Sequence, residues 1–428
     1  MKNMIQSSRT GLSKKTMTTW SRLALGATCA VIATAGLASV NAHATPTDAP
    51  WPLAAPHTPA PVFENPGNAP VLATPRVVPI LYGADPQASV LQKFYAKLAT
   101  STYFASGLGE YGVGKPTFAA PVILIGAAPA VMDDATAASW LVTQISSGTV
   151  PAEDGNTVYA LVYPSSTTVS YGLLYSGIPS PLCGSTSEAT QTSDGTNVPF
   201  TMTGLCEGNT GGLSDTDAET FGISSALSDA FTSPDWAFNP GYSDLSWSGS
   251  GWLLFTGSYT ANVGSLCGTL IHAPTTEKPP DLGYLVPMIW SSQAALGGHD
   301  PCAVSSARRE TYFNAAPDTA GAITAFGPLK GVILPPGGAV TIPVRLFSDG
   351  PIGSWTLGAA ERSDLIPDSF NLLSFSFDRA SGTNGDVVHL TVKRAIAPDG
   401  SVAPDLGFEI TSTRGTTVHE WLVAVGNE

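Results

Sequence analysis

The chain is organised around one predicted helix in its middle, Asp217-Ala-Glu-Thr-Phe-Gly-Ile-Ser-Ser-Ala-Leu-Ser-Asp-Ala-Phe-Thr-Ser-Pro234. Thr216 followed by Glu219 has the pattern of a capping box at a helix start, and Pro234 marks the end. One face of this helix is apolar, with hydrophobic side chains at helical spacing: Ile223, Leu227, Ala230 and Phe231. The opposite face is polar, and any chemistry of the helix is expected there.

The polar face consists of Ser224, Ser225, Ser228 and Asp229. In a metallopeptidase helix, a stripe of this spacing carries two metal ligands one turn apart and a general-base Glu beside the first. No histidine lies between His57 and His272. The sequence therefore predicts that this helix does not bind zinc through imidazole.

The first 44 residues have the pattern of an export signal. Basic residues precede an apolar run from Leu23 to Val40, which ends in Ala42-His-Ala44, an A-x-A cleavage pattern. We expect residues 1–44 to be a signal peptide and the mature protein to be secreted or periplasmic. A membrane anchor is the alternative, but the Ala, Gly and Thr content of the run and the Pro-rich segment after it favour cleavage.

The charge of the mature chain excludes some classes of partner. Without residues 1–44, 14 Lys and Arg remain against 33 Asp and Glu, a net charge of −19. Such a surface repels nucleic acid and anionic lipid, so we expect no nucleic-acid partner and no membrane association after signal cleavage. The same acidity also suits simple solubility in an extracellular protein.

Four cysteines remain after cleavage: Cys183, Cys206, Cys267 and Cys302. An even number in an exported chain favours disulfides. Pairing of nearest neighbours, Cys183 with Cys206 and Cys267 with Cys302, is the simplest of three connectivities, and the sequence leaves the other two open. The close C-x2-C pairs that a four-cysteine zinc site needs are missing.

Residues 71–316 predict a domain of α/β type, preceded by a Pro/Ala-rich, extended and partly mobile leader at residues 45–70. Buried strands and helices alternate along this domain, which predicts a mostly parallel, mixed sheet flanked by helices. Pro79 removes one backbone donor from the first strand and favours a position near a sheet edge or a bulge. The strands are expected at 77–82, 121–126, 158–163 and, at a sheet edge, 198–203, and the helices after Asp85-Pro86 and Asp133-Asp134.

The sequence pattern of residues 317–428 predicts a series of short consecutive strands. Apolar side chains alternate in several short runs with turn signals between them, around Val344, Phe375, Leu390, Ile410 and Leu422. Such a pattern predicts an antiparallel sandwich of immunoglobulin type, with no cysteine pair across it. The expected fold class is therefore α+β, with an α/β-type domain followed by an all-β immunoglobulin-like sandwich.

Two histidine pairs are weak candidates for chemistry. His419-Glu420 lies on a predicted strand and lacks a second histidine four residues on, so a metal site is not expected there. His299-Asp300 precedes a proline and is typical of a turn.

Short segments along nearly the whole mature chain resemble a family of uncharacterised secreted bacterial proteins. That family looks like a zincin-type metallopeptidase domain followed by a β-sandwich, and the resemblance implies the same arrangement here. The segments that carry it are Phe221–Pro234, Val263–Cys267, Trp290-Ser291, Asp300–Cys302, Tyr312–Pro317, Leu346–Pro351 and Gly385–Leu390.

The resemblance also implies that the metal motif is degenerate. In the family the helix carries a pattern like H-E-L-x-E-A-x-T-D-P, and here Ser225 replaces the His, Ala226 the first Glu and Asp229 the second Glu. A later E-x-G-D-x-C pattern has Asn262 and Ser265 in place of its acids. A hydroxyl or an amide is a weak zinc ligand, and an alanine cannot move a proton. No metal and no other cofactor is therefore expected.

Three functions stay open. The first is an exported, non-catalytic metallopeptidase-like protein that binds a protein, a peptide or a cell-surface glycan. The second is a secreted hydrolase, most simply a peptidase, built from Asp229, Glu219 and either His272 or His299, whose side chains would have to converge within about 4 Å. The third is a structural protein of the cell surface or a biofilm.

Overall fold

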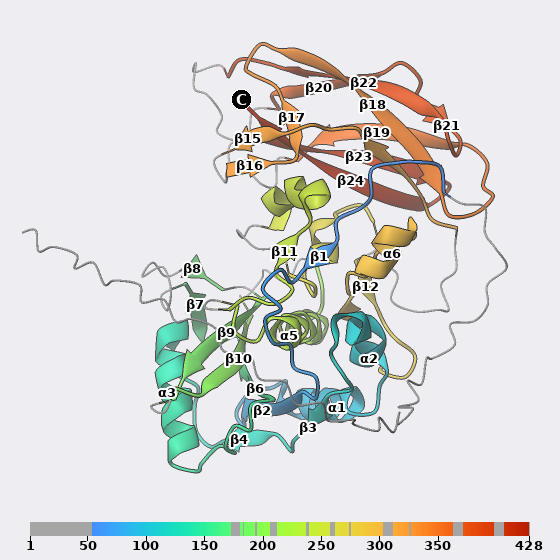
Figure 1. Cartoon of the computed structure of the whole chain (residues 1–428). Helices are drawn as coiled ribbons and strands as arrows, with labels where there is room; N and C mark the ends of the chain where they lie inside the picture. The colour runs from blue at the N-terminus through green and yellow to red at the C-terminus, as the bar shows by residue number, and fades with distance from the viewer. Residues whose placement is uncertain are drawn as a thin grey trace, which may run out of the picture. The chain divides into compact units, whose positions relative to one another are not determined.

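A six-stranded mixed sheet forms the first part of the chain (Figure 1). Its strands are β2 (Arg76–Tyr82), β3 (Thr117–Phe118), β4 (Val122–Leu124), β6 (Thr157–Tyr163), β9 (Gly184–Gln191) and β10 (Asn197–Gly204). The order is β3-β2-β6-β10-β9, with β4 also paired to β2. Only β9 is antiparallel to its neighbour, so the predicted mostly parallel sheet is confirmed.

Pro79 lies at an interruption of the sheet rather than at its edge. On one side, β2 pairs continuously with β6. On the other side, β3 pairs with residues 76–77 and β4 with residues 80–82. The proline falls in the gap between these two short partners, where a missing N–H costs no ladder hydrogen bond.

The prediction that residues 198–203 form an edge strand is wrong. β10 lies between β6 and β9, and β9 is the edge strand. β9 has the sequence Gly-Ser-Thr-Ser-Glu-Ala-Thr-Gln, without the apolar run or alternation that indicates a strand. Its strand conformation depends on pairing with β10 along all eight residues.

Helices cover both faces of this sheet (Figure 1). The helices on these faces are α1 (Ala88–Leu98), α3 (Asp134–Ser146) and α5 (Asp215–Thr232). Two shorter helices of the described residues are α2 (Tyr103–Leu108) and α6 (Ser292–Gly297). Side chains of the strands alternate between two cores: Val77 packs in the core of α1 and α5, and Val78 in the core of α3. Asp133 caps α3 as predicted, because its carboxylate accepts the N–H of Thr136 at 2.7 Å.

Two further sheets form the second part of the chain. The four-stranded sheet has the order β14-β18-β22-β20 and the five-stranded sheet β17-β24-β23-β19-β21. All pairs are antiparallel except β17 with β24. The bounds are β14 (Phe313–Pro317), β17 (Gly331–Ile333), β18 (Ala339–Ser348), β19 (Trp355–Glu361), β20 (Leu373–Phe377), β21 (Ser381–Gly382), β22 (Val387–Arg394), β23 (Leu406–Arg414) and β24 (Thr417–Gly426).

Apolar side chains of the two sheets share one core, for example Leu390 of β22 and Ile410 of β23. Each predicted alternating run falls within a strand, so a mixed α+β fold with a strand-rich second part is confirmed. Strand β14 begins before residue 317 and pairs with β18. The first sheet of this part therefore includes residues from before the predicted domain boundary.

The leader is packed from residue 54 onward, unlike the mobile segment that its composition predicts. Phe63 of β1 (Phe63–Glu64) is 3% exposed, and β1 pairs with β11 (Asp244–Leu245). The indole N–H of Trp290 donates to the carbonyl of Pro61 at 2.9 Å. The ring of His57 stacks on Phe347 of β18, with 3.5 Å between centroids. A few aromatic contacts thus anchor a Pro-rich segment whose regular structure, among the described residues, is the two-residue strand β1.

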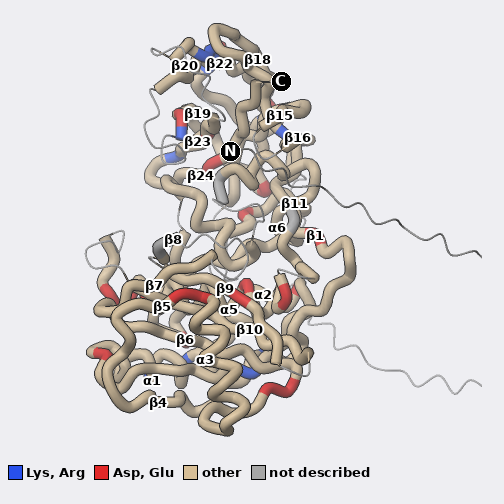
Figure 2. Tube along the Cα trace, turned by 90° about the vertical axis from the view of Figure 1, so that its left-hand side faces the viewer, with Lys and Arg blue, Asp and Glu red and all other residues tan. Residues whose placement is uncertain are grey.

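The remaining elements are short. They are the strands β5 (Val131–Asp133), β7 (Thr168–Tyr171), β8 (Ser180–Pro181), β12 (Thr276–Glu277), β13 (Val286–Pro287), β15 (Ala322–Thr324) and β16 (Gly327–Leu329), and the 3-10 helices η1 (Gly109–Tyr111), η2 (Trp247–Thr256) and η3 (Leu266–Thr269). Asp and Glu are spread over many elements, whereas Lys and Arg are few (Figure 2).

The structure, a computed structural model, describes residues 54–172, 180–182, 184–192, 195–205, 212–236, 239–256, 262–273, 275–302, 311–324, 327–362, 371–397 and 406–427. The predicted signal peptide lies outside these residues, and so do Cys183 and Cys206. Among the helices of the described residues, none combines the length and the apolar character needed to cross a membrane.

Candidate functional site

Helix α5 starts two residues earlier than its sequence pattern suggests. Ser214 is the N-cap, and its hydroxyl accepts the N–H of Asp217 at 3.2 Å. The predicted capping box of Thr216 and Glu219 is wrong. The Thr216 hydroxyl instead donates to Gln87 at 2.9 Å, and Glu219 is buried one turn into the helix.

The polar face of α5, where any chemistry of the helix was expected, is buried. Three of its hydroxyl side chains are satisfied within the helix itself. Ser224, Ser228 and Thr232 each donate to the carbonyl four residues earlier, at 2.8 to 2.9 Å. A stripe of hydroxyls can therefore lie in a packed interior without water.

Helix α5 and the loop of Asn262 and Ser265, two segments singled out by the sequence analysis, meet through the backbone of Gly264. The Ser225 hydroxyl donates to the Gly264 carbonyl at 3.0 Å, and the Gly264 N–H donates to Oδ1 of Asp229 at 2.8 Å. We call these three residues the Gly264 clasp. The side chain of Ser265 turns to its own loop, where it donates to the carbonyl of Asn262 at 3.3 Å.

The clasp leaves no room for a ligand between the helix and the loop. A Cβ atom on Gly264 would lie 2.5 Å from the carbonyl oxygen of Ser225 and 2.6 Å from Cβ of Ser228. Ser225 and Asp229 are each 8% exposed, and Ala226 is 2% exposed. The helix and loop backbones are thus in direct contact at Gly264.

Asp229 is the only ionisable group of the clasp. Burial raises the pKa of its carboxyl group to about 7, and the N–H of Gly264 opposes part of that shift. The carboxyl group therefore changes charge near neutral pH while it remains bound to the loop. The Ser225 hydroxyl donates to a backbone carbonyl, which is not a general base, so this hydrogen bond holds two segments together and does not activate the serine.

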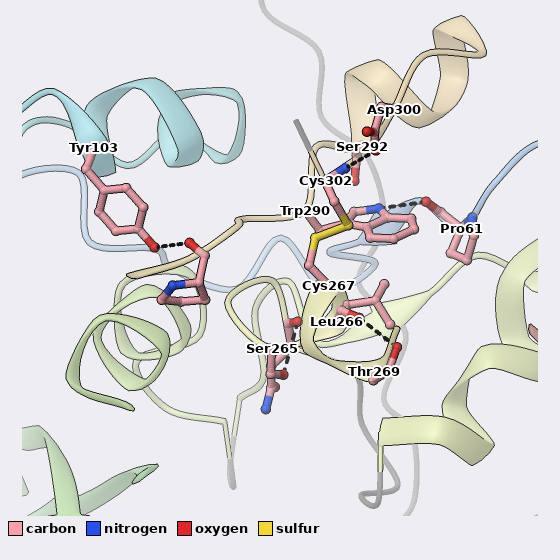
Figure 3. The surroundings of a disulfide bond; sticks show 12 residues. Pro61, Tyr103, Ser265, Leu266, Cys267, Thr269, Trp290, Ser292, Asp300 and Cys302 are labelled. Atoms are coloured by element: carbon pink, nitrogen blue, oxygen red, sulfur yellow. Dashed lines mark hydrogen bonds between the residues drawn. A yellow bond between two sulfur atoms is a disulfide. The ribbon is translucent and has the colours of Figure 1, made fainter. Parts of the chain in front are cut away.

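A disulfide between Cys267 and Cys302 lies just beyond the clasp loop (Figure 3). Its Cα atoms are 5.8 Å apart, and the bond closes a separation of 35 residues. Both sulfur-bearing residues are buried beside Trp290 (Figure 3). The predicted Cys267–Cys302 pair is confirmed, whereas the predicted Cys183–Cys206 pair lies outside the described residues.

The residues of the alternative hydrolase do not converge. Glu219 and Asp229 are ten positions apart on one helix, which separates them by about 15 Å along its axis. Each histidine has its own carboxylate partner elsewhere: Nδ1 of His299 lies 2.9 Å from Asp349, and Nδ1 of His272 lies 2.9 Å from Glu409. The arrangement within about 4 Å that this hypothesis requires is absent for Glu219 and Asp229.

Sequence reasoning missed a second group of ionisable side chains around His272. Glu409 of β23 and Glu420 of β24 are 1% and 3% exposed, and Arg362 beside them is 3% exposed. A single charge inside an otherwise apolar strand, as in Phe408-Glu-Ile410, is the signal that could have indicated it. Among the described residues, one group of at least three potential metal ligands has all its donor atoms within 4.8 Å of one another. Its members are His272, Glu409 and Glu420.

Comparisons of the chain with protein-family models, with curated proteins and with solved structures find no match. The metallopeptidase-like resemblance consequently stays an expectation that rests on residues of the chain itself.

Proposed function

We propose that this chain is an exported, non-catalytic protein that binds a protein, a peptide or a cell-surface glycan. In this proposal its first part is a metallopeptidase-like domain with a degenerate site, and its second part is an immunoglobulin-like sandwich. The export-signal pattern at residues 1–44 supports export. The two packed antiparallel sheets support the immunoglobulin-like sandwich.

The observation that carries the proposal is the Gly264 clasp. Ser225 and Asp229 stand where the resemblance places a metal ligand and an acid, and both are engaged by the backbone of the clasp loop. Ala226, where the general base would stand, has no group that moves a proton. These positions now join two segments of the fold instead of contacting a substrate.

The catalytic half of the proposal is tested with purified mature protein and a mixture of unstructured peptides. We expect no cleavage above a buffer control, with or without a chelator. Peptide cleavage that is abolished in Asp229→Asn or Ser225→Ala would overturn the proposal, because it would show that the clasp residues catalyse. Unfolding of both variants is measured in parallel, to check that a loss of cleavage does not come from a loss of the fold.

The binding half needs a separate measurement, since the ligand class is open. Immobilised peptide and glycan arrays are probed with labelled protein, and binding to members of one array is expected. Absence of binding to both arrays, with no peptidase activity, would favour the structural alternative at the cell surface.

A further inference from the structure

Two carboxylates lie buried side by side on the face of the five-stranded sheet that meets the loop at residues 270–273. Glu409 pairs with Leu422 and Glu420 pairs with Thr411, so the two glutamates are diagonal neighbours on one face. The loop backbone reaches this face directly. Glu420 accepts the N–H groups of Ile271 at 3.2 Å and Ala273 at 2.6 Å, and also that of His272.

Each of the two carboxylates directs one oxygen toward Arg362 and the other toward His272. On one side, Nη1 of Arg362 lies 3.6 Å from Oε2 of Glu409 and 3.9 Å from Oε2 of Glu420. On the other side, Nδ1 of His272 lies 2.9 Å from Oε1 of Glu409 and 3.8 Å from Oε1 of Glu420. The guanidinium thus orients both carboxylates, and their Oε1 atoms converge with the imidazole nitrogen.

Among the described residues of this group, the ionised side chains carry one more negative than positive charge. Two carboxylates and one guanidinium leave an excess of one negative charge in a region that is almost free of water. Oε2 of Glu409 accepts no hydrogen bond from the described residues. A cation from solution can reach this group only from its exposed side. That side is formed by His272, whose side chain is 49% exposed.

We propose that His272, Glu409 and Glu420 bind a divalent transition-metal cation of the zinc class. Nδ1 of His272 and one oxygen of each glutamate all lie within 4.8 Å of one another, close to the spacing of ligands around one ion. One imidazole and two carboxylates suit zinc or manganese, and the exposed side leaves a coordination position for water. An ion at this position would take the place of the direct contact between Nδ1 of His272 and Oε1 of Glu409.

Such an ion would join the loop at residues 270–273 to strands β23 and β24. The loop begins three residues after Cys267, so the ion and the disulfide would fix the same segment from two sides. This site is separate from the Gly264 clasp and does not depend on the proposed function.

The test is a titration of metal-free mature protein with zinc chloride near neutral pH, followed by calorimetry and by metal analysis after dialysis. We expect one zinc per chain and a higher unfolding temperature in its presence. His272→Ala removes an exposed ligand and should weaken zinc binding at least about tenfold. Glu409→Gln should weaken it similarly.

His389→Ala is the matched control. His389 is also exposed and also has its Nδ1 2.9 Å from a carboxylate, Asp378, but it has no third ligand, so zinc binding should not change. Absence of stoichiometric zinc binding would overturn the proposal, and so would binding that survives His272→Ala.

Discussion

Asp229 carries a buried carboxyl group whose charge couples the stability of α5 to pH. Its pKa rises from 3.8 in water to about 7 in the fold because of burial. An acid with a raised pKa holds its proton more tightly in the folded than in the unfolded state. The carboxyl group of Asp229 therefore makes its full contribution to folding stability at low pH. This contribution is lost as the pH rises from about 4 through about 7.

Asp229→Asn should abolish this pH dependence, since the amide keeps the oxygen that accepts the Gly264 N–H. At about pH 8 we expect the variant to be roughly 2–4 kcal/mol more stable than the wild type, and at about pH 4 to be equally stable. Denaturant unfolding at the two pH values measures the difference. Ser225→Ala is the control, because it loses one hydrogen bond and should cost about 1 kcal/mol at both pH values.

At the scale of elements, the contact between α5 and the clasp loop depends on the absence of a side chain at residue 264. Local patterns predict α5 well, because its apolar residues recur at helical spacing and Pro234 follows its end. They do not indicate what covers its polar face. Serines that donate to their own helix and serines that face a solvent-filled cleft have the same spacing in sequence.

Gly264→Ala should separate α5 from the loop and destabilise the fold by about 1–3 kcal/mol, because the added methyl group meets backbone that cannot move aside. Gly268→Ala is the matched control. A Cβ atom there would have Phe221 as its nearest neighbour at 3.9 Å, so a change within about 0.5 kcal/mol is expected. Equal destabilisation by both variants in chemical denaturation would contradict a tight clasp.

At the scale of the molecule, the N-terminal segment contacts both parts of the chain. The carbonyl of Pro61 accepts from Trp290 near the disulfide, Phe63 is buried in the shared core, and His57 stacks on Phe347 of the second part. Its composition of Pro, Ala and Thr predicted mobility, because few of its residues can be buried. The structure shows that one or two well-placed aromatic rings are sufficient to order it.

Phe63→Ala should therefore destabilise the whole chain by about 3–5 kcal/mol, as expected for the loss of a buried aromatic ring. Glu64→Ala, at the exposed neighbouring position of β1, should change the stability by less than about 0.5 kcal/mol. Thermal unfolding followed by circular dichroism compares the two. If Phe63→Ala unfolds like the wild type, the segment does not contribute to the shared core.

The sequence by itself determined the features that depend on neighbours along the chain. These are α1, α3 and α5, the parallel strands and the alternating strands of the second part, whereas the pairing of Cys267 with Cys302 was only the simplest of three connectivities. Helical spacing, alternation and caps report local geometry, so they are visible without the fold. Only the tertiary structure decided that the polar face of α5 is closed by Gly264 and that Glu409, Glu420, Arg362 and His272 converge. The physical reason is that each of these contacts joins segments far apart in sequence, where pairing and burial, and not local pattern, select the neighbours.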